Sequence, residues 1–265
     1  MEKMDDKENL KTVESLAVVM PVYNEGERIY RNLIETATQL EKFCNPDSSV
    51  CNDFRIIAVN DGSSDDSLSE VKRAVAEDSR IKVISYEKNR GKGYAVRRGM
   101  LASKSEYTAF LDSDLEIPPY LLEGFLRKAQ ESDADIVIGS KLHKDSQIKY
   151  PFIRRIMSYG YYVFIKVLFG LKVKDTQTGI KLFKTESASE ILKNLRTSRF
   201  SFDLELLAIA ANKGLKIEEM PVVVNFSRNK KNRSTIRLSS IFEMLRDSVR
   251  IKRYLRRMKK DQDQL

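Results

Sequence analysis

Residues 107–118 read Tyr-Thr-Ala-Phe-Leu-Asp-Ser-Asp-Leu-Glu-Ile-Pro, an apolar segment that runs directly into three carboxylates. Side chains two positions apart point the same way in an extended chain, so we expect Asp112, Asp114 and Glu116 to converge at a strand end. Mg²⁺ and Mn²⁺ prefer oxygen ligands and are often held by one or two carboxylates together with substrate phosphates. The segment therefore predicts a divalent metal site, and its expected ligand is a nucleoside diphosphate.

Two upstream segments have the same character, a buried strand that breaks into a polar turn. They are residues 17–25, Ala-Val-Val-Met-Pro-Val-Tyr-Asn-Glu, and residues 56–65, Ile-Ile-Ala-Val-Asn-Asp-Gly-Ser-Ser-Asp. Both precede a helical pattern, and this alternation is typical of parallel βαβ units with ligand loops at the carboxyl ends of the strands. The pattern predicts an α/β fold with a mostly parallel central sheet. Further elements are expected as strands at 81–86, 107–112 and 134–139, and as helices at 92–104 and 118–131.

The segment 89–93, Asn-Arg-Gly-Lys-Gly, opens the helix that follows the third strand. Glycines and a cation at a helix N-terminus favour phosphate, so Gly91 and Lys92 are candidate phosphate contacts. The spacing is neither that of Walker A nor G-x-G-x-x-G.

The order of these motifs resembles that of family 2 glycosyltransferases, which have the GT-A fold. The motifs are Pro21-Val22-Tyr23-Asn24-Glu25, residues 60–65, residues 89–93 and Asp112-Ser113-Asp114. Three later strings are similar, more narrowly, to the dolichyl-phosphate and polyprenyl-phosphate hexose synthases: Gly139-Ser140-Lys141, residues 175–183 and Phe202-Asp203-Leu204-Glu205. The resemblance covers roughly residues 16–240. We expect a disordered tail at 1–14, a Rossmann-like GT-A domain at 15–235 and a basic amphipathic helix at 236–265.

The resemblance implies an inverting, metal-dependent transfer of a hexose from a nucleotide sugar to a polyprenyl phosphate, with Mg²⁺ or Mn²⁺ as cofactor. Asp114 and Glu116 resemble the metal ligands, and Asp112 either shares the ion or lies nearer the ribose. The donor contacts that it implies are Pro21, Tyr23, Glu25, Asp61, Gly91, Lys92, Asp112, Gln177, Arg228 and Arg233. The acceptor contacts that it implies are Lys141, Arg154 and Ser158.

A lipid phosphate is already anionic and can attack without a general base, so the acceptor side needs cations. Lys141 and Arg154 therefore join Asp112 and Asp114 as the expected catalytic set. The chain departs from the family at Lys141, where Arg is usual, and at Glu116, where mannose-type relatives have Gln. Residues 175–183 look more like glucose-type synthases that use UDP-glucose. Residues 112–119 look more like mannose-type synthases that use GDP-mannose, so the donor stays open between the two.

Two other functions stay open. A same-fold enzyme acting on a glycan, a protein or another lipid would need a base and would leave the cations at 141 and 154 unexplained. A non-enzymatic nucleotide- or RNA-binding module would use the basic C-terminal segment instead, but it explains the acidic strand ends poorly.

The net charge of +9 is concentrated at one end of the chain. Residues 228–260 hold thirteen Lys and Arg against two acidic residues, which leaves the rest of the chain at −2. This distribution argues against a general nucleic-acid-binding face. Apolar residues recur there at helical spacing, and we expect the first half of the helix to pack on the core and the second half to contact an anionic membrane.

Residues 150–170 combine Tyr, Phe and aliphatic side chains with Arg154, Arg155 and Lys166. The apolar run is too short to span a bilayer, so it is either a buried helix or a helix at the water–lipid interface, and the family resemblance favours the interface. The charged residues 1–11 argue against a secretion signal. We therefore expect a cytoplasmic protein attached peripherally to the cytoplasmic face of a membrane.

Three further polar positions have simpler expected roles. Cys44 and Cys51 are interpreted as reduced or incidental and not as a disulfide. Asp203 is expected to act as a cap in the first turn of a helix, and His143 to be solvated. Asp175 is expected, with Gln177, to position the sugar or the acceptor.

Overall fold

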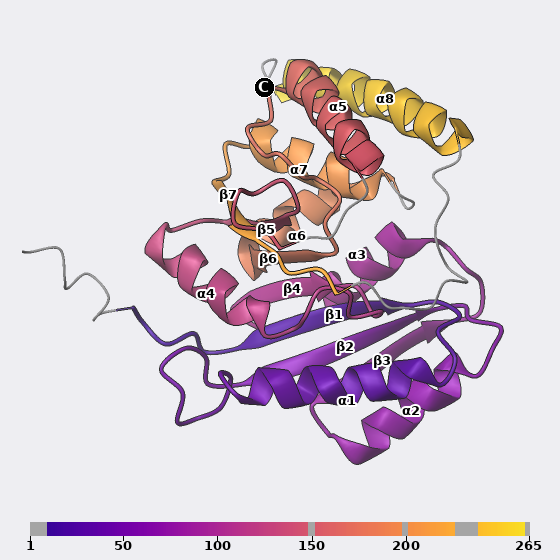
Figure 1. Cartoon of the computed structure of the whole chain (residues 1–265), viewed down its shortest axis with the longest axis vertical. Helices are drawn as coiled ribbons and strands as arrows, with labels where there is room; N and C mark the ends of the chain where they lie inside the picture. Colours follow the sequence, from indigo (N-terminus) through magenta and orange to yellow (C-terminus); the bar gives the residue numbers. More distant parts are fainter. Residues whose placement is uncertain (1–9, 148–151, 198–200, 226–237, 263–265) are drawn as a thin grey trace, which may run out of the picture.

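Seven strands form one mixed sheet in the described part of the computed structural model, in the order β3-β2-β1-β4-β6-β5-β7 (Figure 1). The structure describes residues 10–147, 152–197, 201–225 and 238–262. The strands are β1 (Leu16–Val22), β2 (Phe54–Asp61), β3 (Ile81–Tyr86), β4 (Tyr107–Leu111), β5 (Ile136–Ser140), β6 (Ile180–Lys184) and β7 (Ile217–Pro221). β6 runs antiparallel to β4 and β5, and the other four pairings are parallel. The prediction of a mostly parallel α/β sheet is confirmed.

Helices cover both faces of the sheet (Figure 1). They are α1 (Arg28–Glu41), α2 (Ser67–Glu77), α3 (Lys92–Ala102), α4 (Leu121–Glu131), α5 (Phe152–Phe169), α6 (Thr185–Asn194), α7 (Phe202–Asn212) and α8 (Leu238–Gln262). The buried residues fall into two apolar clusters. One packs the sheet against α1, α2 and α4, and the other packs it against α3, α6, α7 and the inner sides of α5 and α8.

The sequence of β1 explains why there are two apolar clusters. Its side chains alternate in direction, so Leu16 and Val18 join the cluster under α1, while Ala17 and Val19 join the cluster under α3. A strand that is apolar at successive positions is therefore buried on both faces, as expected for the centre of a parallel sheet.

The order in which successive strands are added to the sheet reverses at β1. It passes from β1 to β2 and β3 on one side and then returns to place β4 on the other side of β1. Loops at the carboxyl ends of strands on either side of such a switch point diverge and leave a crevice for ligands. The polar turns after β1, β2 and β4 all reach this edge.

The element boundaries differ from the predicted ones where local chemistry intervenes. The helix expected at 118–131 begins at Leu121, after Pro118 and Pro119, because the residue before a proline is disfavoured in the helical region. The strand expected at 134–139 is Ile136–Ser140, and the sequence interpretation did not anticipate β6 or β7.

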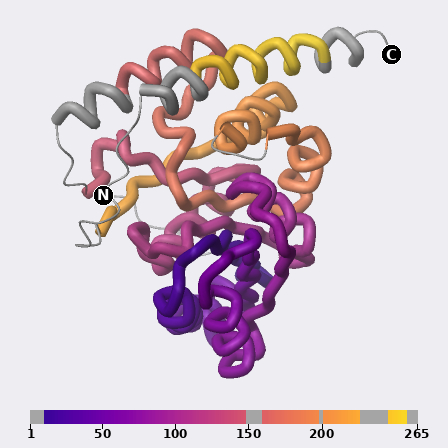
Figure 2. The backbone as a smooth tube through the Cα atoms, turned by 90° about the vertical axis from the view of Figure 1, so that its right-hand side faces the viewer, coloured from indigo at the N-terminus to yellow at the C-terminus, as the bar shows by residue number. Residues whose placement is uncertain are grey.

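α5 and α8 lie side by side at one end of the molecule, outside α7 (Figures 1 and 2). We call them the outer helix pair. Side chains are described from Tyr159 onward in α5 and from Leu245 to Arg257 in α8. Among the described residues, no helix is long and apolar enough to cross a bilayer.

The interpretation of the two cysteines as unpaired is wrong. Cys44 and Cys51 form a disulfide, with Cα atoms 4.4 Å apart. Cys44 follows the end of α1, and the backbone N–H of Asn45 donates to the carbonyl of Cys51 at 2.9 Å, so the turn between them brings both buried side chains together. That turn is set by backbone hydrogen bonds that the cysteine spacing alone does not reveal.

Candidate functional site

The turns after β1 and β2 are tied to each other by side chain to backbone hydrogen bonds. Asn24, whose φ of 53° is left-handed, accepts from the N–H of Ser64 at 2.9 Å and donates its own N–H to Ser63 Oγ at 3.1 Å. Ser67 Oγ accepts from the N–H of Glu25 at 2.8 Å. These bonds hold Glu25 and the exposed ring of Tyr23 at the switch-point edge, directly after Pro21 and Val22 at the end of β1.

Asp61 holds the loop in front of α3. Its carboxylate accepts from the N–H of Arg90 at 2.7 Å, from the N–H of Gly91 at 2.8 Å and from Asn89 Nδ2 at 3.0 Å. Gly91 has a φ of 94°, a conformation that glycine adopts without strain. Asp61 therefore positions the loop that carries Gly91 and Lys92, while its contact with a nucleobase stays a prediction.

The acidic loop is not the extended chain that the sequence pattern assumed. β4 ends at Leu111, and Leu115 has a left-handed φ of 52°, so alternate side chains no longer point the same way. Among the described residues, no group of three acidic, histidine or cysteine side chains is placed to hold a metal ion by itself. The three acids therefore do not share one direction as an extended chain would give them, because the chain turns between them, and their joint role as metal ligands stays a prediction.

The same three acids nevertheless line one small pocket at the edge of the sheet. Its lining residues are Asp112, Asp114, Glu116, Ile117, Lys141, Gln177, Gly179 and Val224. The pocket thus brings together the three predicted metal ligands, of which Asp112 is also a predicted donor contact, with the predicted donor contact Gln177 and the predicted acceptor contact Lys141. These residues come from loops after β4, after β5 and before β6.

Burial, together with the crowding of negative charge, raises the pKa of carboxyl groups at this edge. Desolvation in the pocket, followed by the charge of Asp112, raises the pKa of Asp114. Burial raises the pKa of Glu25, and the charges of Asp114 and Asp65 add to that effect against Arg28. We call Glu25, Asp112, Asp114 and Glu116 the acidic edge.

The acidic edge fits a divalent cation that is also bound by a ligand. Its carboxylate oxygens are the donor atoms that Mg²⁺ and Mn²⁺ prefer, and its raised carboxyl pKa values mark negative charge that a cation would relieve. Such cations are commonly held by one or two carboxylates together with the phosphates of a ligand, and the acidic edge supplies the carboxylates.

Asp175 brings Lys141 and Gln177 to the pocket. Its carboxylate accepts from the N–H of Lys141 and from the N–H of Gln177, each at 3.0 Å. Glu219 Oε1 in turn accepts from the N–H groups of Lys174 and Asp175. Asp175 is therefore a loop anchor whose removal would release a predicted donor contact and a predicted acceptor contact together.

Asp203 does not cap α7, although it lies in the first turn as expected. The cap of α7 has no side-chain hydrogen bond, and Asp203 instead pairs with Lys181 Nζ at 2.6 Å. Lys181 is fully buried and also donates to the carbonyl of Thr178 at 2.7 Å. Burial lowers the pKa of Lys181 and raises the pKa of Asp203, and their mutual attraction opposes both shifts.

Lys181 is a site-supporting residue that the sequence interpretation missed. Its signal was a charged side chain inside the apolar strand Ile-Lys-Leu-Phe of β6. His143, expected to be solvated, is partly buried, and its Nδ1 accepts from the N–H of Asp145 at 3.3 Å.

Several expected contacts fall where side chains are not described. Arg228 and Arg233 lie outside the described residues. Arg154 and Ser158 lie in α5, in the part whose side chains are not described. Their roles stay predictions.

The outer helix pair has two distinct stripes. On α5 the exposed apolar residues Tyr159, Val163 and Val167 recur every four positions. On α8 the exposed arginines are Arg246, Arg250, Arg253, Arg256 and Arg257. The second half of α8, expected to contact a membrane, also packs on the protein, because Ile251 and Leu255 are buried. Its contact with a membrane stays a prediction.

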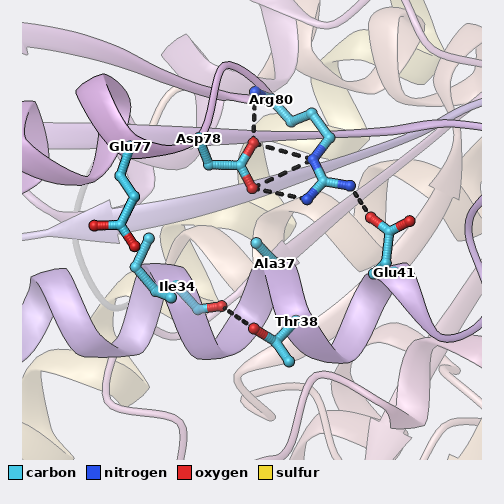
Figure 3. Close-up of a pocket in the computed structure, with 7 residues that line it drawn as sticks. All are labelled: Ile34, Ala37, Thr38, Glu41, Glu77, Asp78 and Arg80. Atoms are coloured by element: carbon cyan, nitrogen blue, oxygen red, sulfur yellow. Dashed lines mark hydrogen bonds and ion pairs between the residues drawn. The ribbon is translucent and has the colours of Figure 1, made fainter.

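A second hollow lies far from these residues, between α1 and the end of α2 (Figure 3). Its main polar group, Arg80, is bonded to Asp78 at 2.8 Å and paired with Glu41. No predicted site residue lines it, so we assign the site to the acidic edge.

Solved structures with the same fold are glycosyltransferases. A glucosyl-3-phosphoglycerate synthase from Mycobacterium tuberculosis, crystallised with Mn²⁺, UDP and glucosyl-3-phosphoglycerate, has a TM-score of 0.62 at 18% identity, over 90% of this chain and 78% of that one. A mannosyltransferase from Pyrobaculum calidifontis in complex with GDP-Man and Mn²⁺ has a TM-score of 0.57 at 16% identity, over 84% of this chain and 62% of that one. The fold is therefore GT-A, as the sequence motifs led us to expect.

Comparison of the sequence with protein families and with known proteins identifies the family of glycosyltransferases to which the chain belongs. The model of "Glycosyl transferase family 2" matches residues 17–192. A dolichyl-phosphate β-glucosyltransferase from Dictyostelium discoideum is 34% identical over 91% of this chain and 75% of its own length. One from Saccharomyces cerevisiae is 31% identical over 83% of this chain and 68% of its own length. The chain belongs to glycosyltransferase family 2.

Proposed function

We propose that this glycosyltransferase moves glucose from UDP-glucose to a dolichyl or related polyprenyl phosphate, with inversion and with a divalent cation. The observation that carries the proposal is the pocket in which Asp112, Asp114 and Glu116 of the acidic edge meet Lys141 and Gln177. The sequence left the donor open between UDP-glucose and GDP-mannose. The similarity to dolichyl-phosphate β-glucosyltransferases favours glucose.

The reaction needs a leaving group that can carry charge. The bond between the anomeric carbon and the β-phosphate oxygen breaks, and UDP departs with the electron pair. When bound, a divalent cation neutralises charge on that diphosphate. Asp112 and Asp114 would hold the cation, with Glu116 beside them, and Lys92 at the start of α3 would hold phosphate oxygen at a helix N-terminus.

The acceptor supplies its own nucleophile. A phosphate oxygen of the lipid forms the new bond to the anomeric carbon, and no proton is lost because that oxygen is already anionic. The role left to the protein is to orient the anion and offset its charge, which suits Lys141 on the loop that Asp175 anchors. A β-product from an α-linked nucleotide sugar requires one inversion, in agreement with the names of the relatives.

The outer helix pair supplies the surface for a lipid substrate. Tyr159, Val163 and Val167 form an exposed apolar stripe on α5, and the arginines of α8 lie on the helix packed beside it. Apolar side chains that enter the interface, flanked by cations that reach lipid phosphates, are typical of peripheral membrane attachment.

One experiment tests donor, acceptor and metal together. The purified protein in detergent is incubated with UDP-glucose, GDP-mannose or a dTDP-sugar, each with dolichyl or undecaprenyl phosphate, and with Mg²⁺, Mn²⁺ or EDTA. We expect glucosyl transfer from UDP-glucose that EDTA abolishes. If transfer occurred from GDP-mannose alone, the proposed donor would be wrong and the donor would be GDP-mannose. If no polyprenyl phosphate accepted the sugar, the proposed acceptor would be wrong and a glycan, a protein or another lipid would take its place.

A further inference from the structure

Lys92 occupies an unexpected position for a phosphate contact. Its ammonium lies 2.5 Å from Asp112 Oδ1, and about a third of each side chain is exposed. A residue that the sequence assigns to the diphosphate thus pairs with a residue that it assigns to the metal.

Asp112 is held in this position from the other side. Its N–H donates to the carbonyl of Gly179 at 2.9 Å, and a Cβ added to Gly179 would lie 2.3 Å from Asp112 Oδ2. The carboxylate therefore lies against a backbone that leaves no room for another side chain, with its other oxygen turned to Lys92.

Lys92 in turn belongs to a network of alternating charges. Lys181, behind it, pairs with Asp203 at 2.6 Å, and the Lys92 and Lys181 ammonium groups lie over the ring of Phe110, at 5.7 Å and 4.8 Å from its centroid. Although burial acts to lower it, the carboxylates of Asp112 and Asp203 raise the pKa of Lys92. Lys92 is thus a cation held between two carboxylates, one at the pocket and one in the core.

We propose that Lys92 is an exchangeable counterion: it neutralises Asp112 before the donor binds, and it yields Asp112 to the divalent cation and turns to the diphosphate when the metal–nucleotide complex binds. The exchange rests on the proposed function, because it needs a metal and a nucleotide diphosphate at this edge. The exchange makes the binding of metal and nucleotide mutually dependent. The metal takes Asp112 from Lys92 and so frees Lys92 for the diphosphate, and the diphosphate takes Lys92 from Asp112 and so frees Asp112 for the metal.

The exchange predicts effects of opposite sign for one substitution. Lys92 and the metal compete for Asp112, so Lys92→Met should tighten the binding of metal alone. The same change removes a cation from the diphosphate, so it should weaken the binding of UDP in the presence of metal. A residue that only holds phosphate would leave the first quantity unchanged, and a residue that only supports the fold would weaken both.

The test is calorimetric titration of the full chain with Mn²⁺ alone, and then with UDP at saturating Mn²⁺. For Lys92→Met we expect about five- to tenfold tighter Mn²⁺ binding, as for removal of one competing charge from a partly exposed pair, and about tenfold weaker UDP binding. Lys92→Arg keeps the charge and should bind Mn²⁺ as the wild type does. Arg98→Met, at an exposed position of the same helix, removes one charge away from Asp112 and should change neither affinity.

The outcomes separate the exchange from the proposed function. Mn²⁺ binding to Lys92→Met that equals or falls below wild type, while wild type binds Mn²⁺ and UDP, overturns the exchange and leaves the metal site standing. If neither protein binds Mn²⁺ with or without UDP, the metal-dependent function and the exchange are both overturned. Should Lys92→Met fail to fold by circular dichroism, Lys92→Gln is titrated in its place with the same expectations.

Discussion

The acidic edge and the outer helix pair are built in opposite ways. In the loops around the acidic edge, single carboxylates each hold two or three donors. Asp61 accepts from the backbone N–H groups of Arg90 and Gly91 and from Asn89 Nδ2, and Asp175 accepts from the backbone N–H groups of Lys141 and Gln177. The outer pair rests on the core through apolar side chains such as Ile165, Ile251 and Leu255 and presents long repeated stripes to the outside.

This difference indicates how each region should respond to change. Where one carboxylate fixes two loops, a single substitution should have a large effect, because preorganised charges act on a reaction only in the correct geometry. Where a stripe repeats the same chemistry, each residue contributes a small and nearly additive share, so several must be changed together.

The largest effect is expected at Asp114. Asp114→Asn should reduce transfer by about a thousandfold or more, because a cation that loses a carboxylate ligand no longer neutralises the departing diphosphate. The melting temperature should fall little or rise, since burial and then the charge of Asp112 disfavour the ionised carboxylate and raise its pKa. Steady-state transfer and thermal unfolding measure the two effects.

The control for Asp114→Asn is Asp66→Asn, an exposed acid on the loop after β2 without a side-chain cap hydrogen bond. It should retain wild-type turnover. Full activity of Asp114→Asn, or activity that survives EDTA, would show that the acidic edge is not the site of a required metal ion.

The next largest effect concerns the core behind the edge. Asp203→Asn leaves the fully buried ammonium of Lys181 without its partner, and breaking such a pair costs about 3 to 5 kcal/mol. Urea unfolding should show that loss. Asp203→Leu combined with Lys181→Met should recover most of it, because neither buried charge remains. A double variant no more stable than Asp203→Asn would show that the pair is not coupled as the structure indicates.

Much of this architecture could be predicted from local sequence, and the rest depends on contacts between distant residues. The strands β1, β2 and β4 could be predicted because each is a largely apolar run that is followed by turn residues. The antiparallel direction of β6 does not, because an apolar run reads alike in either direction.

The errors in the predicted site have the same origin. Asp203 was expected to cap its own helix, the nearest available role, whereas its partner Lys181 lies 22 positions away. The convergence of Asp112, Asp114 and Glu116 was inferred from an extended chain, and the left-handed Leu115 ends that geometry. Local patterns place residues at the correct edge of the sheet, but they do not define which of them touch.

The outer helix pair should respond only to a grouped change. Reversal of Arg250, Arg253 and Arg257 to Glu should release the protein from vesicles containing anionic lipid, because each basic residue near such a surface contributes about 1 kcal/mol. Flotation measures binding, and transfer to a short-chain soluble acceptor should be unchanged. The matched control reverses the charge of three exposed residues on the other side of the molecule, Arg31 in α1, Lys42 directly after α1 and Lys72 in α2, and it should leave flotation unchanged. Equal loss of vesicle binding in both variants would show that net charge, and not the stripe on α8, accounts for the effect.

The smallest effect compares the two regions by the same substitution. A Cβ at Gly179 would meet Asp112 Oδ2 at 2.3 Å and Cγ at 2.6 Å, so Gly179→Ala must displace that carboxylate. A Cβ at Gly160, inside α5, meets nothing within 4 Å, and alanine there should stabilise the helix by roughly 0.5 to 1 kcal/mol. Gly179→Ala should therefore weaken Mn²⁺ binding and transfer, at a cost in stability of about 1 kcal/mol, while Gly160→Ala raises the melting temperature and leaves both activities intact. Calorimetric titration with Mn²⁺ measures the binding of the cation to the two variants, and thermal unfolding measures their stability. If Gly179→Ala bound Mn²⁺ as tightly as Gly160→Ala, the close approach at Gly179 would not position Asp112, and the acidic edge would tolerate rearrangement much as the outer helix pair is expected to do.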